Sequence, residues 1–432
     1  MVLWLIIALL LLMFLAYRGV PIIVATIFCS IFVLITSRMP IIEGLSGTYM
    51  QGMAGFFQKF FLIFLLGAIF GKVMEFTGAA ESIARSVINT FGKKYAMVAV
   101  VIATAILCYG GVSVFVVLFC IYPLAMSLFQ KSDVPRRLFP AALLAGAATF
   151  SMTSPFTPSI QNIIPMKYLG TDTTAAALPG TIAALVLAAL VIGYLQREVN
   201  KARRNNEPFD DGGAEVAVTV EEKKDKDLPN VWLCVIPMII LLAMLNVFKL
   251  DVIIALGSGV LLAIILLWKY VPSIKELWEH IQKAAGNATF SIANTCAAVG
   301  FGTVVSQTEG FKMAIDAVTG IGGNPLLAAG VATTALAGIA GSASGGLGIA
   351  MPIIADHFLP LGVNPEALHR VVVMACGGLD ALPHNGFVIT LLVFSGLTHK
   401  KSYKDCFVVS VLIPLISLVV LIVLFYILPG WM

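Results

Sequence analysis

Long apolar runs recur along this sequence, and they constrain the fold more than any other feature. A helix needs about 20 apolar residues to cross the hydrocarbon core of a bilayer. Ten runs approach or exceed that length, at 2–16, 20–37, 55–76, 137–165, 174–196, 231–247, 251–269, 286–305, 368–396 and 406–428. Only 12% of the residues are charged, against roughly 25% in an average soluble domain. We therefore expect an all-α polytopic membrane protein embedded in the lipid bilayer.

Two further apolar stretches, 97–129 and 325–357, are too long for a single span. Each is broken in the middle by a glycine- and serine-rich motif, CYGGVS in the first and GSASGG in the second. Either stretch could form two spans or one re-entrant hairpin. In either arrangement, we expect the helix to be interrupted in the middle of each stretch.

A charged segment divides the chain into halves at 1–196 and 231–432. Residues 197–230 are about half charged and show no apolar periodicity, which is typical of a solvated linker. Glycines and prolines recur across the two halves in the same order and at a nearly fixed offset. The pairs are Gly71 with Gly302, Gly78 with Gly310, Gly92 with Gly323, Gly111 with Gly341, Pro123 with Pro352 and Pro135 with Pro365.

This pattern indicates an internal repeat. Five spans plus one re-entrant hairpin per half give an odd number of crossings, so the second half would be inverted relative to the first. Each half would also contain an interrupted helix, at 137–165 and at 368–396.

The lysines and arginines test this topology through the positive-inside rule. With both hairpins re-entrant, one side of the membrane receives 21 of them and the other side six. The basic side is predicted to be the cytoplasm, which places the linker inside and both termini outside. The six on the outer side are Arg38, Lys59, Lys167, Lys249, Lys312 and Arg370. Because the basic residues report topology, no nucleic-acid partner is expected.

Inverted repeats with broken helices are typical of secondary transporters, whose substrate sites lie near the midplane at the breaks. A half-helix that starts there directs unpaired N–H groups toward the cavity, which suits a carboxylate. None of the four breaks contains arginine or lysine. Any single hydroxyl or glycine could instead serve helix packing. The candidate substrate-binding residues are Gly110, Gly111, Ser113, Ser151, Thr153, Thr157, Gln161, Asn162, Ser342, Ser344, Gly345, Gly346 and Asn385.

Asp380 and His384 lie in the break CGGLDALPHNGF, residues 376–387. An acid within a membrane span is costly and is a functional candidate by default. We expect Asp380 to carry a coupled proton and His384 to orient it or share that proton. Sodium could replace the proton, since unwound carbonyls with Asp380 and Asn385 offer oxygen ligands. No cofactor or bound metal is expected.

An enzyme is the alternative from another class. The motifs GGLD and GSASG each differ by one residue from those of intramembrane aspartyl and serine peptidases. A Ser344–His384 dyad is geometrically conceivable, but hydrolysis would also need an oxyanion donor. We expect no enzymatic activity.

Two stretches, SPFTPSIQNIIPMKYLGT at 154–171 and LHRVVVMACGGLDALPHNGFVITLLVFSGLTHKKSY at 368–403, resemble the gluconate:proton symporter (GntP) family of permeases. The resemblance is greatest to the branch for short hydroxy acids such as 3-hydroxybutyrate. It implies the ion-transporter superfamily architecture, a homodimer and an elevator-type transport domain. The matching positions are Ser151, Thr153, Thr157, Gln161, Asn162, Asp380, His384 and Asn385.

The sugar-acid branch has a proline- and histidine-rich run where this chain has TSPFTPSIQN, which disfavours gluconate itself. The sequence therefore predicts a plasma-membrane symporter that imports a small hydroxymonocarboxylate with protons by alternating access.

Overall fold

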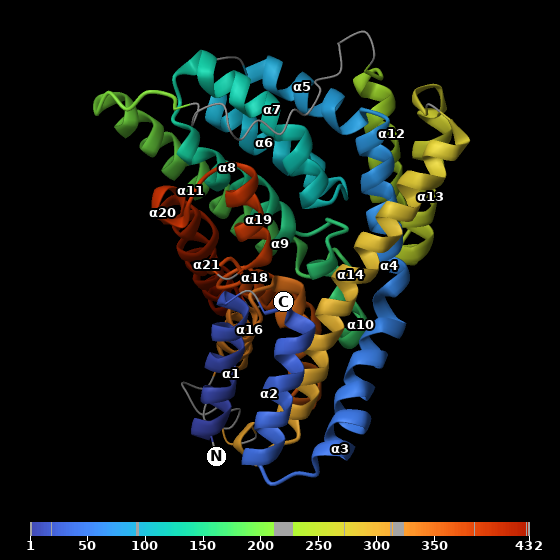
Figure 1. Ribbon diagram of the computed structural model, residues 1–432, viewed down its shortest axis with the longest axis vertical. Coiled ribbons are helices and arrows are strands. Elements are labelled where there is room, and N and C mark those ends of the chain that lie inside the picture. Colours follow the sequence, from blue (N-terminus) through green and yellow to red (C-terminus); the bar gives the residue numbers. More distant parts are fainter. Residues whose placement is uncertain are drawn as a thin grey trace.

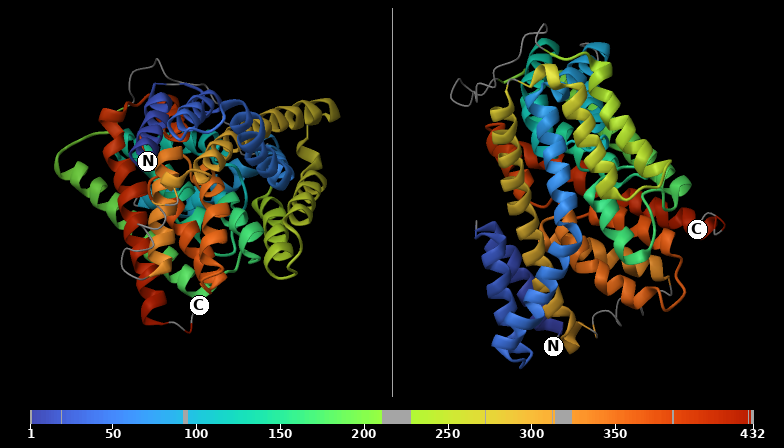
Figure 2. Two further views of the ribbon diagram at one scale, coloured as in Figure 1. Left: turned by 90° about the horizontal axis from the view of Figure 1, so that it is seen from below. Right: turned by 90° about the vertical axis from the view of Figure 1, so that its right-hand side faces the viewer.

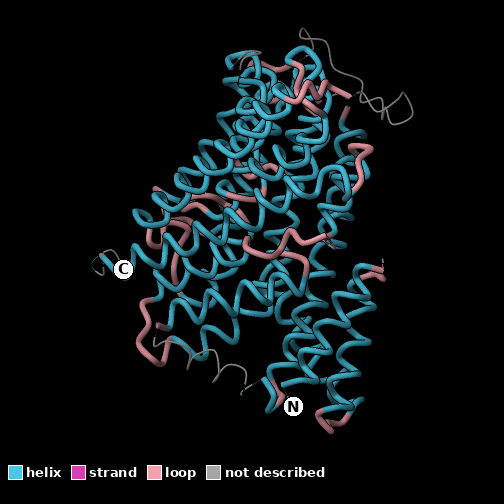
Figure 3. Tube along the Cα trace, turned by 90° about the vertical axis from the view of Figure 1, so that its left-hand side faces the viewer, coloured by secondary structure: helices cyan, strands magenta, loops and turns pink. Residues whose placement is uncertain are grey.

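The computed structural model of the chain describes residues 2–18, 20–91, 95–210, 228–271, 273–311, 313, 324–383, 385–428 and 430. Within these ranges every regular element is a helix and none is a strand (Figures 1 and 3). Large apolar side chains such as Phe28, Leu185 and Val419 are more than half exposed. Apolar surface of this kind is typical of a membrane-embedded protein. The all-α polytopic prediction is confirmed.

The described residues before the linker form short and long helical elements. They are α1 (Val2–Tyr17), α2 (Ile22–Thr36), α3 (Ile41–Glu43), η1 (Gly44–Tyr49), α4 (Met50–Phe76), α5 (Ala79–Phe91), α6 (Ala96–Tyr109), α7 (Val114–Ser132), η3 (Arg136–Leu138), α8 (Phe139–Ala147), α9 (Phe150–Thr153), α10 (Ile160–Leu169) and α11 (Ala177–Arg204).

The described residues after the linker continue in the same all-helical manner. Their elements are α12 (Val231–Asn246), α13 (Val252–Leu266), η6 (Trp268–Tyr270), α14 (Ile274–Ser306), α16 (Pro325–Ala340), α17 (Ala343–Phe358), α18 (Pro365–Cys376), α19 (Gly386–Phe394), α20 (His399–Phe407), η7 (Val408–Leu412) and α21 (Ile413–Ile427).

Two long helices, α4 and α14, pack along each other and join the two halves of the chain (Figures 1 and 2). Small residues allow this close approach. A Cβ on Gly52 would meet the hydroxyl oxygen of Thr303, and a Cβ on Gly300 would lie 2.8 Å from the carbonyl oxygen of Tyr49. Glycines at a helix crossing bring backbones together in this way in membrane proteins.

The two stretches that are too long for one span each form a pair of packed helices, α6 with α7 and α16 with α17. Each pair turns at a glycine in the left-handed region, Gly111 with φ +92° and Gly341 with φ +57°. Glycine adopts this conformation without the steric cost that a Cβ brings. The first pair lies near the top of Figure 1 and α16 lies in its lower half.

The two interrupted helices have irregular backbone in the middle. Between α9 and α10 the chain is non-helical from 154 to 159, where Pro155 and Pro158 each lack an N–H group. Between α18 and α19 the described backbone at 377–383 is likewise non-helical and contains Pro383. These segments bring irregular backbone into the interior of the protein.

Helix α11 continues to Arg204 and so includes the first eight residues of the predicted linker. The predicted linker starts earlier because many charged residues mask a stripe of buried side chains on one face of this helix. Glu198, Val199 and Ala202 are all at most 7% exposed, and they continue the stripe begun by Val191 and Leu195. This spacing is the 3.6-residue period of a helix that packs on one face.

Candidate substrate site

The two interrupted helices share one local arrangement, built around Asn162 and Asn385. Each asparagine donates a hydrogen bond from Nδ2 to the carbonyl oxygen five residues earlier, Thr157 at 3.0 Å and Asp380 at 2.8 Å respectively. Asn385 also caps α19, because its Oδ1 accepts from the N–H of Val388 at 2.8 Å. Thr157 and Asp380 therefore occupy equivalent places in the two breaks.

Thr157 and Asp380 share a second property, an unpaired buried oxygen. Thr157 is 0% exposed and Asp380 is 6% exposed. The Thr157 hydroxyl and the Oδ1 atom of Asp380 have no hydrogen-bond partner among the described residues. Since an unpaired buried polar group is destabilising, such atoms indicate a place where a ligand, water or ion binds.

Hydrogen bonds tie each helix pair to the interrupted helix of its own half at the break. The Tyr109 hydroxyl donates to the carbonyl oxygen of Pro155 at 2.8 Å. In the second half, Asn385 Nδ2 donates to the carbonyl oxygen of Gly341 at 3.0 Å. The four breaks predicted from the sequence therefore form two connected pairs.

Arg370 is the largest fully buried side chain, and it links the halves. It extends from α18 into the first break and donates to the carbonyl oxygens of Ala175 (2.8 and 3.0 Å), Thr153 (3.0 Å) and Thr173 (3.2 Å). Its Nη1 atom also donates to Asn162 Oδ1 at 3.2 Å. The guanidinium group thus uses all five of its N–H bonds, four on backbone carbonyl oxygens and one on the Asn162 side chain. The Thr173 carbonyl oxygen also accepts from the N–H of Phe156 and from Asn162 Nδ2.

His369 completes this network on the same helix. Asn162 uses both N–H bonds of Nδ2 on carbonyl oxygens, so its Oδ1 is the acceptor for His369 Nε2 at 3.0 Å. The other ring nitrogen, Nδ1, lies 2.6 Å from the Thr171 hydroxyl. A neutral imidazole with its hydrogen on Nε2 satisfies both contacts.

Arg370, which the predicted topology counts on the outer side of the membrane, has a fully buried side chain beside the first break. In the described part of the chain, no carboxylate forms an ion pair with it. Its positive charge is therefore buried beside the first break without a contacting acid. The sequence did contain a signal, because His369 and Arg370 both fall inside the predicted span 368–396, where an ionisable residue indicates a functional or buried position.

Ser151 and Thr153 use their hydroxyls on their own helical turns. The Ser151 hydroxyl donates to the carbonyl oxygens of Gly146 and Ala147, at 2.5 and 3.2 Å, and that of Thr153 donates to Thr149 at 3.1 Å. Both residues are 1% exposed. This is the structural alternative that the sequence left open for serine and threonine.

The tip between α16 and α17 contains Ser342, Ser344, Gly345 and Gly346. Ser342 caps α17, since its hydroxyl accepts from the N–H of Gly345 at 3.2 Å and lies 3.3 Å from the Ser344 hydroxyl. A Cβ on Gly346 would come within 2.3 Å of the Ala337 Cα atom, so this glycine serves close packing. Both serines remain partly exposed and accessible at the helix start.

The tip between α6 and α7 contains Gly110, Gly111 and Ser113. Ser113 precedes α7 but makes no capping hydrogen bond through its side chain. A Cβ on Gly110 would collide with the end of the Met238 side chain. The first turn of α7 therefore keeps N–H groups that no Ser113 hydroxyl satisfies.

Two candidates remain less defined by contacts. Gln161 is half-buried in the first turn of α10. His384 lies outside the described residues. The predicted Asp380–His384 pair and the Ser344–His384 dyad both include this residue, so they lie outside the described residues too. In the described ranges, no cluster of three or more His, Cys, Asp or Glu side chains is arranged to hold a metal ion.

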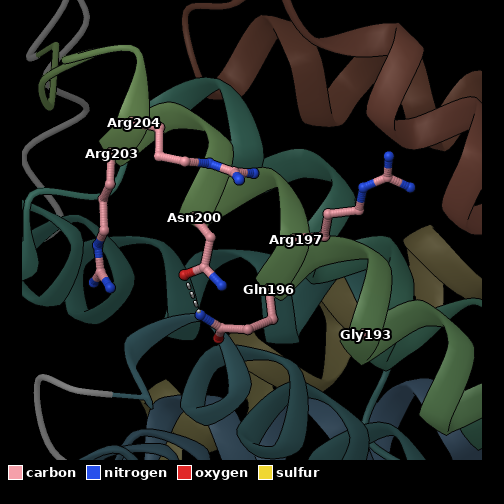
Figure 4. Close-up of a pocket in the computed structure, with 6 residues that line it drawn as sticks. All are labelled: Gly193, Gln196, Arg197, Asn200, Arg203 and Arg204. Atoms are coloured by element: carbon pink, nitrogen blue, oxygen red, sulfur yellow. Dashed lines mark hydrogen bonds between the residues drawn. The ribbon is translucent and has the colours of Figure 1, made fainter.

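A surface hollow of about 490 Å³ lies on α11, away from the four breaks in sequence. It is lined by Gly193, Gln196, Arg197, Asn200, Arg203 and Arg204 (Figure 4). A second hollow of about 320 Å³ shares Gly193 and Arg197 with it and continues toward α21. None of these residues was predicted as a site residue.

Apolar helices that are interrupted inside the protein, with buried polar groups gathered at the interruptions, define the chain as a membrane transport protein. The comparisons with known proteins agree. The chain belongs to the GntP permease family, because the model of that family matches residues 1–427. It is a transporter rather than an enzyme, and the peptidase alternative is not supported.

The relatives are transporters too. The uncharacterized transporter YxjC of Bacillus subtilis is 37% identical over 445 residues, covering 93% of this chain and 94% of that protein. A gluconate permease of Pseudomonas aeruginosa is 28% identical over 169 residues, which cover 39% of this chain and 36% of that protein.

Two solved structures have a similar fold. The YdaH transporter of Alcanivorax borkumensis superimposes with a TM-score of 0.57 at 16% identity, covering 90% of this chain and 89% of that one. The Neisseria gonorrhoeae protein MtrF, described as illuminating a class of antimetabolite efflux pumps, gives a TM-score of 0.57 at 12% identity, covering 90% and 84%. At these identities the similarity concerns the fold alone.

Proposed function

We propose that this protein is a secondary transporter that imports a small hydroxymonocarboxylate together with protons. The substrate would be a short hydroxy acid such as 3-hydroxybutyrate or a sugar acid such as gluconate. The observation that carries the proposal is Asp380, a buried acid in a helix break whose Oδ1 atom has no hydrogen-bond partner in the part of the chain that the structure describes. Membership of a permease family and the partial similarity to a gluconate permease support an organic anion as cargo.

The substrate carboxylate would bind at the first turns of α7 and α17. Both helices begin at a break, so their N–H groups and positive dipole ends face an anion. Ser342 and Ser344 add hydroxyl donors at one of these ends. The buried charge of Arg370 raises the electrostatic potential for an anion beside the first break, although its own N–H groups are already used.

The substrate hydroxyl would bind Thr157. Thr157, Gln161 and Asn385 are the candidates for this contact, and their hydrogen bonds within the protein favour Thr157. Asn385 uses Nδ2 and Oδ1 on backbone groups, whereas the Thr157 hydroxyl is unpaired. Gln161, half-buried on the next helix, would assist.

Asp380 would carry the coupled proton, with His384 orienting it or sharing the proton. Burial disfavours a charged carboxylate, and an arriving anion disfavours it further. Proton binding and substrate binding would then strengthen each other by the same factor, as linkage requires. This reciprocity is what couples the two fluxes.

The wider architecture belongs to the same proposal. The chain would have two inverted repeats, each with five spans, a re-entrant helix pair (α6–α7 or α16–α17) and an interrupted helix. It would act as a homodimer in the plasma membrane, with the linker inside, both termini outside and an elevator-like movement. The arrangement that recurs at Asn162 and Asn385 supports the repeat.

Uptake into proteoliposomes tests the substrate class. An imposed inward proton gradient should drive uptake of at least one member of a panel comprising 3-hydroxybutyrate, lactate, glycerate, gluconate and citrate. If none is transported and none competes, the hydroxy-acid proposal is wrong. Uptake that depends on sodium at fixed pH, and not on the proton gradient, would favour the alternative of sodium coupling.

A further inference from the structure

The two hollows on α11 form one continuous surface groove with a cationic end and an apolar end. They share Gly193 and Arg197. Polar and cationic side chains of α11 line the first hollow. The second hollow is lined mainly by apolar side chains of α11, η7 and α21. The apolar lining comprises Ala189, Leu190, Val408, Ile413 and Ile416, with Tyr194 beside them.

The cationic end consists of Arg197, Arg203 and Arg204, all exposed. Figure 4 shows Arg197 and Arg203 on opposite sides of Gln196 and Asn200, which are joined by a hydrogen bond of 3.3 Å. Within the described ranges, none of the three guanidinium groups forms an ion pair. Their charges are therefore open to an external anion.

Acidic side chains do lie near this surface, but they are buried or already form ion pairs and hydrogen bonds within the protein. Arg137 binds both Glu207 and Asp405 at 2.6 Å. Asp405 also accepts from the Tyr194 hydroxyl at 2.8 Å, and Glu198 is buried. The net charge that faces the groove is thus positive.

The cationic and apolar ends of the groove are arranged like the headgroup and the acyl chains of a phospholipid. Ten residues of helix separate Leu190 from Asn200, which is about 15 Å along the axis. The apolar end lies toward the middle of a helix long enough to cross a membrane, and the cationic end lies at its terminus beside the linker. A basic pocket at the membrane surface that continues into an apolar groove suits an anionic lipid.

We propose that this groove binds an anionic phospholipid, with its phosphate at Arg197 and Arg204, which lie two turns apart on one face of α11, and an acyl chain between α11 and α21. Arg203, on the other side of Gln196 and Asn200, adds positive charge to the same end of the groove. Gly193 makes room for the lipid where the two hollows meet. A Cβ at this position would meet no atom within 4 Å. The proposal is independent of the transported substrate.

Thermal unfolding of the purified protein in detergent, titrated with phosphatidylglycerol, tests this proposal. The unfolding midpoint of the wild type should rise with phosphatidylglycerol. Replacing all three arginines by glutamine should weaken the apparent affinity about tenfold or more, since each cation contributes to binding at a membrane surface. Gly193→Leu, which fills the apolar end, should weaken it without removing charge.

The matched control removes three exposed lysines from the opposite side of the molecule. Lys269, Lys275 and Lys283 are exposed on or near η6 and α14, and their replacement by glutamine should leave the phosphatidylglycerol response unchanged. Phosphatidylcholine and glycerol 3-phosphate should each have little effect on the wild type, because one lacks net charge and the other lacks chains.

Three results would overturn the proposal. The first is an equal phosphatidylglycerol response in the wild type and the arginine variant. The second is an equal loss of response in the lysine control, which would indicate only bulk charge. The third is efficient disulfide cross-linking between Leu190→Cys protomers, which would identify a second copy of the chain as the occupant.

Discussion

At the scale of single residues, Thr157 and Asp380 stand out because each has a buried oxygen without a hydrogen-bond partner among the described residues, at equivalent places in the two breaks. Replacing a hydroxyl that serves only packing by a methyl group should change neither substrate binding nor stability much. Replacing a hydroxyl that binds substrate should weaken substrate binding. Thr157 therefore distinguishes a binding role from a structural one.

We expect Thr157→Val to raise the KM for substrate about tenfold, which corresponds to one hydrogen bond of about 1.4 kcal/mol. The thermal stability should be unchanged, since no hydrogen bond within the protein is lost. Transport assays in proteoliposomes together with thermal unfolding measure both quantities. Thr104→Val is the matched control, because Thr104 is also 0% exposed with an unpaired hydroxyl but lies within α6. An equal KM in both variants would argue against substrate contact.

Arg370→Lys should reduce the free energy of unfolding by about 3 kcal/mol. The ammonium group keeps the charge but cannot reproduce the planar set of donors that reaches Thr153, Thr173 and Ala175. Thermal unfolding in detergent measures the change, with the exposed Arg38→Lys as the control. An unchanged midpoint would show that the carbonyl groups do not depend on Arg370.

At the scale of helices, glycine positions decide how closely the broken helices pack. Gly346→Ala should destabilise the protein by about 1–3 kcal/mol, because the new Cβ would lie 2.3 Å from the Ala337 Cα atom and force α16 and α17 apart. Gly257→Ala on α13 meets nothing within 4 Å and should be neutral or stabilising. Comparable unfolding midpoints for the two variants would contradict the packing described for α16 and α17.

Arg137 joins the end of α11 to α20 through Glu207 and Asp405. Its hydrogen bond holds the pKa of Glu207 below the ordinary value of 4.5. A lowered pKa means that the stabilisation is present above pH 4.5 and is lost as the pH falls through the folded-state value. The wild type should therefore be more stable than Glu207→Gln at pH 7, and the difference should vanish on acidification. Unfolding midpoints measured from pH 7 to pH 3.5 test this, and a difference that grows in acid would contradict it.

The sequence predicted the helix breaks because glycine and proline act locally, through φ and the missing N–H group. It identified Asp380 by the same local logic, as an acid within an apolar run. It missed the Arg370 network because those contacts join residues more than 190 positions apart. It also ended α11 too early, since charged residues on the exposed face concealed the buried stripe at Glu198, Val199 and Ala202.

At the scale of the whole molecule, the two halves are held together by helix packing and by polar contacts at the breaks. Helices α4 and α14 pack along each other, and Arg370 binds carbonyl groups of the first half from α18. Such a molecule needs a substrate-dependent change of state for alternating access. In the proposed mechanism, that change is permitted when Asp380 is neutral and the anion is bound, and again when Asp380 has released its proton and the site is empty.

Proton-driven uptake by Asp380→Asn, compared with substrate exchange by the same variant, tests the central claim most directly. Asparagine is close in size to a protonated aspartic acid but cannot release a proton. We predict that an inward pH gradient no longer drives accumulation, whereas exchange of labelled for unlabelled substrate across the proteoliposome membrane persists. Accumulation that still follows the pH gradient in this variant would contradict the assignment of Asp380 as the proton carrier.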